Sequence, residues 1–157
     1  MIEHFEPPQP LESEDHREFQ WSAAFGAGLI PGLILLITPR GSPWSSLTFF
    51  NPAVLGRPAP PQSGLSLGGS IFLHLIVSLL YGLIIARIVA RFTQLRAVIA
   101  GGVVGLLLYA INFGFVSWRA PGFIGNEISV VFTHVVFGLI AGGAYQGLLR
   151  RAASATR

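Results

Sequence analysis

The amino-acid sequence predicts an all-α polytopic membrane protein with four transmembrane helices, arranged as two parallel two-helix repeats. Hydrophobic residues make up 52% of the 157 residues and charged residues only 11%, too little charge to cover the surface of a soluble domain of this size. Several apolar runs are long enough to cross a bilayer. Two of these runs begin with the same pattern of residues, which indicates an internal repeat.

The repeated pattern places a histidine two residues after a phenylalanine, a small residue four positions later and a glycine four positions after that. Its members are His74, Ser78 and Gly82 in one run and His134, Gly138 and Gly142 in the other. Because both copies lie early in an apolar run, we expect the two histidines at similar depth. The two halves of the chain would then be related by an axis along the membrane normal.

Residues 1–21 differ from the rest of the chain in charge, and we expect them to form a mostly disordered cytoplasmic tail. They hold six of the seven carboxylates and a single arginine, Arg17. A secretory signal would begin with basic residues followed by an apolar core, and this segment has neither.

A single transmembrane domain is expected over residues 22–149, with crossings at about 22–38, 68–90, 97–118 and 127–149. The first crossing is short and Pro31 interrupts it, but neighbouring helices can satisfy the carbonyl that a proline leaves free. A proline-rich connection over residues 39–67 separates the first two crossings. Residues 150–157 are expected to form a short C-terminal tail in the cytoplasm.

The arginines set the expected orientation. One side of the membrane would carry seven of them: Arg17, Arg87, Arg91, Arg96, Arg150, Arg151 and Arg157. The other side would carry three: Arg40, Arg57 and Arg119. The positive-inside rule therefore predicts a multi-pass protein of the bacterial inner membrane with both termini in the cytoplasm and the histidines in the outer half.

His74 and His134 are the strongest functional candidates, because an ionisable side chain within a crossing is costly and faces the bundle interior. One interpretation is structural, with each imidazole bonded to a carbonyl, a hydroxyl or the other histidine. A second makes them axial ligands of a b-type haem. A third is proton relay or substrate binding. We expect no metal site, because structural zinc needs four ligands and the chain has no cysteine.

Four further polar residues are candidates within or beside the crossings. Ser78 and Tyr81 follow His74 on the same helix, and Asn112 is expected to form an interhelical hydrogen bond. Glu127 begins the fourth crossing, where a carboxylate complements the helix dipole. It also lies one to two turns before His134.

Small residues at intervals of four predict close helix packing, because they let backbones approach in lipid. The expected packing positions are Gly28, Gly32, Gly101, Gly105, Gly138 and Gly142.

The two histidine patterns, with Asn51-Pro52 in the connection before the first of them, resemble a family of small bacterial membrane proteins of unknown function. Those proteins have four crossings and a histidine early in helices two and four, followed by small residues and glycine. The resemblance covers about residues 22–149. It implies the four-helix fold and the importance of His74 and His134, and it implies no reaction.

The sequence favours a non-enzymatic structural or accessory component and leaves an enzymatic role open, since no nucleophile triad, phosphate loop or carboxylate pair is present. A haem-binding redox module and a small transporter or channel are the alternatives, although polar side chains are sparse for an ion pathway. The expected partners are the lipid bilayer and other membrane subunits or a second copy. The arginines flank apolar runs and form no basic face, which argues against nucleic acid.

Overall fold

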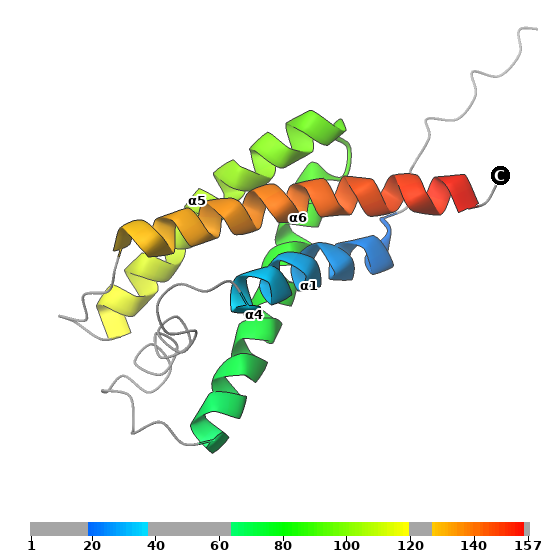
Figure 1. The fold of residues 1–157 in the computed structure, drawn as a ribbon. Coiled ribbons are helices and arrows are strands. Elements are labelled where there is room, and N and C mark those ends of the chain that lie inside the picture. Colours follow the sequence, from blue (N-terminus) through cyan, green and yellow to red (C-terminus); the bar gives the residue numbers. More distant parts are fainter. Residues whose placement is uncertain (1–18, 38–63, 120–126, 156–157) are drawn as a thin grey trace, which may run out of the picture.

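The computed structural model describes residues 19–37, 64–119 and 127–155, and this part of the chain forms four α-helices (Figure 1). They are α1 (Trp21–Ile37), α4 (Gly64–Val89), α5 (Gln94–Arg119) and α6 (Glu127–Ala155). The expected acidic tail up to residue 18 and the proline-rich connection over 38–63, with Arg40, Arg57 and Asn51-Pro52, lie outside the described residues. So do residues 120–126 and 156–157 and the side chains of Arg119 and Glu127.

Three helices are long and apolar enough to cross a membrane, over Ile71–Val89, Gln94–Trp118 and Ile128–Ala155. The all-helical, membrane-protein class predicted from the composition is therefore confirmed. α1 is apolar as well, but with 17 residues it is shorter than the other three.

Three helices extend beyond the crossings expected from hydropathy. One is α5, which covers Gln94–Arg119 where the expected crossing is 97–118. α4 begins at Gly64, ahead of the expected start at residue 68, and α6 continues through Arg150 and Arg151 to Ala155. The arginine pair ends the apolar run, but the alanines that follow favour helix strongly. The end of the hydrophobic stretch is therefore not the end of the helix.

The helices pack in a definite order (Figure 1). α5 lies along α6, and α1 packs against both α4 and α6. α1 and α6 run in opposite directions, so the start of α1 lies beside the C-terminal half of α6. There the ring of Phe19 stacks on Tyr145, with 6.0 Å between the ring centroids. The turn between α4 and α5 meets the same region of α6, because Gln146 donates a hydrogen bond to the carbonyl of Val89 at 2.8 Å.

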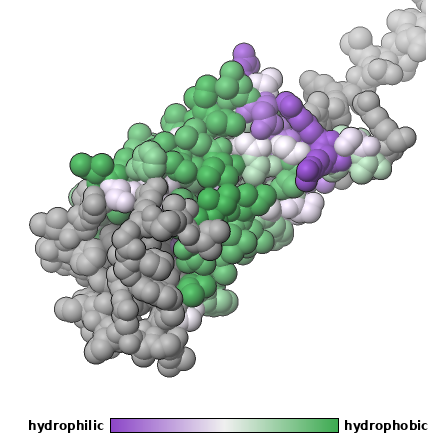
Figure 2. All heavy atoms as spheres, in the orientation of Figure 1, coloured by the Kyte–Doolittle hydropathy of each residue, from purple (hydrophilic) through white to green (hydrophobic). Residues whose placement is uncertain are grey.

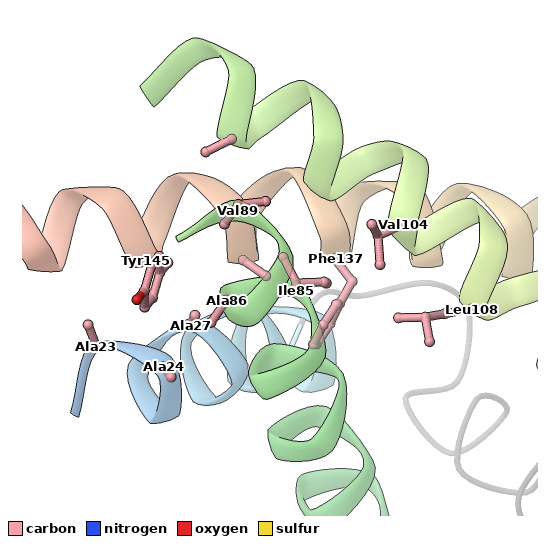
Figure 3. Packing of buried hydrophobic residues seen from close by; sticks show 12 residues of the cluster. Ala23, Ala24, Ala27, Ile85, Ala86, Val89, Val104, Leu108, Phe137 and Tyr145 are labelled. Carbon is pink, nitrogen blue, oxygen red and sulfur yellow. The ribbon is translucent and has the colours of Figure 1, made fainter. Parts of the chain in front are cut away.

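The buried core is small and consists largely of short side chains (Figure 3). Ala23 and Ala27 of α1 lie near Tyr145 of α6, while Ile85 and Val89 of α4 lie near the centre of the cluster. Its remaining members include Ala24, Ala86, Ala97, Val104, Leu108, Phe137 and Ala141. Short side chains allow the helix axes to come close together, as is common where helices associate in lipid.

Large apolar side chains point outward instead. On α5, a stripe of four residues is more than half exposed: Ile99, Val103, Leu107 and Ile111. On the face shown in Figure 2, hydrophobic atoms cover most of the described surface and hydrophilic residues gather at the end where α6 finishes. An exterior of this kind suits a lipid environment.

Candidate functional site

The closest helix contact joins α5 to α6 through four glycines. A Cβ atom added to Gly138 would meet the carbonyl of Gly101, and one added to Gly101 would meet the carbonyl of Gly138. Likewise, a Cβ atom at Gly105 would meet the carbonyl of His134, and one at Gly142 the carbonyl of Ala97. Only glycine permits backbones to lie this close.

A second close contact joins α1 to α4. A Cβ atom on Gly28 would meet the carbonyl of Ser78 and lie 2.8 Å from the Cα atom of Leu79. A Cβ atom on Gly82 would in turn meet the Cα atom of Gly28. Ser78 is buried against Gly32, where an added Cβ atom would be 2.8 Å from the serine Cβ and Oγ atoms. The six glycines expected as packing positions thus all lie in these two contacts.

A chain of hydrogen bonds crosses the bundle between the two glycine contacts. Tyr81 on α4 donates its hydroxyl proton to Oδ1 of Asn112 on α5, at 2.5 Å. The Nδ2 atom of Asn112 donates to Nε2 of His134 on α6, at 2.8 Å. Nδ1 of His134 donates to the carbonyl of Val130, one turn earlier on α6, at 2.9 Å. Donors and acceptors alternate correctly throughout, with a neutral imidazole protonated at Nδ1.

Aromatic rings surround this chain. The rings of Tyr81 and Tyr109 lie 6.3 Å and 5.8 Å from the imidazole of His134, measured between centroids. Phe137 packs edge-on against Tyr81 from one turn further along α6. The polar atoms therefore sit in an apolar setting, where a hydrogen-bond partner lost by mutation is expensive to replace.

His74 forms a separate hydrogen bond between two helices. Its Nε2 atom donates to the carbonyl of Gly32 on α1, at 3.0 Å. Each histidine thus bonds across a different helix pair, His74 between α4 and α1 and His134 between α6 and α5.

Both imidazole nitrogens of His134 are used, by Asn112 and Val130, so neither is left for a direct bond to His74. Haem ligation through Nε2 would require His134 to exchange the Asn112 bond for iron and His74 to give up Gly32. The geometry thus favours hydrogen bonding over a shared axial ligand. Among the described residues no group of three histidine, cysteine or carboxylate side chains is placed to hold a metal ion.

Two glutamines that were not among the sequence-based candidates form hydrogen bonds between helices where α4 ends and α5 begins. Gln146 is buried and donates to Val89 on α4, and Nε2 of Gln94 donates to the carbonyl of Gly143 at 3.0 Å. Gln146 carries the same signal as Asn112, a lone amide in an apolar run, and could have been found by it. Gln94 lies just before the expected third crossing, outside any apolar run, so the sequence offers no reason to single it out.

Comparison with protein-family models, curated proteins and solved structures finds no match to this chain.

Proposed function

We propose that the chain is a four-crossing protein of the bacterial inner membrane that acts as a structural or accessory component, packing with partner helices. One observation carries the proposal. The interior polar side chains Tyr81, Asn112, His134 and His74 are bonded to the bundle itself, while the large apolar side chains face outward. Such a domain offers a membrane partner an apolar surface more readily than it offers a solute a polar site.

The length of α1 is compatible with a fourth crossing. At about 1.5 Å per residue a 17-residue helix spans roughly 25 Å, close to the hydrocarbon thickness of about 30 Å. The aromatic residues Phe19 and Trp21 at its start suit the headgroup level. Its small residues pack against α4, so it would cross beside that helix.

The proposed orientation follows from the arginines. Five of them, all exposed, lie at the end of the bundle where the start of α1 meets the C-terminal half of α6: Arg87, Arg91, Arg96, Arg150 and Arg151. We call this the arginine end. The positive-inside rule would place it, and both termini with it, in the cytoplasm.

Equivalent contacts support an internal repeat. Gly28 on α1 meets α4 at Ser78, next to Gly82, and Gly101 on α5 meets α6 at Gly138 and Gly142. The pair Ser78 and Gly82 in α4 and the pair Gly138 and Gly142 in α6 thus occupy equivalent positions in their helix contacts. This equivalence, with a histidine four residues before the contact in α4 and α6, also supports the resemblance to the family of four-helix membrane proteins.

The exposed stripe of α5 is the surface proposed for a partner helix. A photoreactive amino acid placed at Leu107 or Ile111 should cross-link to a discrete protein in native membranes, since both side chains point outward. The same probe at the buried Val104 or Leu108 is the matched control and should cross-link only within the chain. Labelling of lipid alone at all four exposed positions of the stripe would contradict the accessory role.

A further inference from the structure

The arginine end carries a concentrated positive charge that the described residues do not balance. Arg87 and Arg91 each lie two residues from Val89, which Gln146 contacts, and Arg150 follows Gln146 by one helical turn. Arg96 lies two residues after Gln94, which bonds to the same helix. The one carboxylate residue of the described helices, Glu127, begins α6 at the opposite end.

The start of α1 is anchored beside these arginines. The hydroxyl of Tyr145 forms a hydrogen bond with the backbone of Gln20 and lies within the electrostatic influence of Arg87. Phe19 stacks on the ring of Tyr145. The chain therefore enters the bundle at the arginine end, whichever side of a membrane that end faces.

Immediately before this anchor the sequence is strongly acidic. Six carboxylate residues precede Phe19: Glu3, Glu6, Glu12, Glu14, Asp15 and Glu18. Opposite charges joined by so short a tether meet at a high effective concentration, so pairs that are weak individually act together.

The chain between the carboxylates and Gln20 is long enough for them to contact the arginines. The eight residues from Glu12 to Gln20 can span roughly 26 to 29 Å when extended. Along α6, the rise from Tyr145 to Arg151 is only about 9 Å. Arg87 lies beside Tyr145, while Arg91 and Arg96 lie two residues after Val89 and Gln94, which bond to Gln146 and Gly143 of α6. All five arginines of the arginine end are thus within reach of the carboxylates between Glu12 and Asp15.

We propose that the acidic segment 12–18 docks on the arginine end of its own chain and covers the surface formed by Arg87, Arg91, Arg96, Arg150 and Arg151. The segment neutralises arginines that otherwise repel one another, and it occupies the surface that anionic lipid headgroups would contact. The inference is independent of the proposed accessory role, because it depends only on the anchor and the charges.

The test is a distance measurement between spin labels. The chain has no native cysteine, so Ser13→Cys with Ser154→Cys places one label in the acidic segment and one near the end of α6. In nanodiscs of zwitterionic phosphatidylcholine we expect a narrow short-distance population. Salt near 1 M, where the Debye length falls to about 3 Å, should abolish it.

Charge variants identify the contact. Glu12→Gln, Glu14→Gln and Asp15→Asn together should remove the short-distance population without altering any described helix. Arg150→Gln with Arg151→Gln should do the same from the other side. Arg119→Gln, at the far end of α5, is the matched control and should leave the population intact.

Three results would overturn the inference. One is a broad distribution that salt and both sets of variants leave unchanged. Another is a narrow population that persists in the triple acidic variant. The third is its loss when phosphatidylglycerol is added to the nanodisc, which would assign the arginine end to lipid headgroups in place of the acidic segment.

Discussion

The amide of Asn112 donates a hydrogen bond to Nε2 of His134, and the same side chain accepts one from Tyr81. A single residue of α5 therefore joins α4 to α6 in the interior of the bundle. The bond also fixes the imidazole in the form protonated at Nδ1, because that atom donates to Val130. The histidine that the sequence singles out is thus held by a residue on a neighbouring helix, in a contact made entirely by the chain itself.

The glycine contact between α5 and α6 predicts a sharp difference between two glycines of one helix. Gly138→Ala should lower the stability of the bundle by about 1 to 3 kcal/mol, because the new methyl group meets the carbonyl of Gly101. Gly147→Ala, on the same helix with open space around it, should be neutral or stabilising by up to about 1 kcal/mol. Thermal unfolding in mild detergent would measure both. Equal stability of the two variants would count against the packing.

The contact between α1 and α4 makes a matching prediction for the position of α1. Gly82→Ala should push α1 away from α4, because the methyl group meets the backbone of Gly28. A cysteine at Ala24, which is fully buried, should then become reactive toward a thiol reagent. Gly69→Ala, in open space near the start of α4, is the control and should leave that cysteine protected. Protection that survives Gly82→Ala would show that α1 does not depend on this contact.

The buried hydrogen bond of Gln146 should contribute measurably to the stability of the bundle. Gln146→Leu should cost about 0.5 to 1.5 kcal/mol, because it removes a buried hydrogen bond between α6 and α4 while the carbonyl of Val89 keeps the bond from the amide of Phe92. Ser154→Ala removes an exposed side-chain hydrogen bond near the end of the same helix and should change stability by less than about 0.5 kcal/mol. The free energies of unfolding of the two variants should be compared under the same conditions. A Gln146→Leu variant as stable as the wild type would show that the hydrogen bond to Val89 does not stabilise the bundle.

The use of both histidines in hydrogen bonds leads to a spectroscopic prediction. Protein purified from haem-replete cells should have the same absorption spectrum as the His74→Ala and His134→Ala variants, since Gly32 and Asn112 already engage the two Nε2 atoms. A Soret band that disappears in each single variant would instead support the haem-binding alternative.

The sequence predicted the helices and the small contact residues, because both depend on local composition and spacing. It could not supply the partners of the polar side chains. Whether His134 faces Asn112 or His74 depends on the rotation and register of α5 against α6, which Gly101 and Gly138 determine through contacts remote in sequence. α6 extends past the expected crossing for a different reason: Arg150 marks where the apolar run stops, whereas helix propensity continues to Ala155.

The most direct test is a double-mutant cycle on Asn112→Ala and His134→Ala, read as unfolding free energy in a membrane mimetic. The interior bond predicts a coupling energy of about 0.6 kcal/mol and up to about 1.7 kcal/mol. The parallel cycle on His74→Ala and His134→Ala should be additive within about 0.5 kcal/mol, because the two histidines have different partners. Additive losses in the first cycle with strong coupling in the second would contradict the account and point to a site shared by the two histidines.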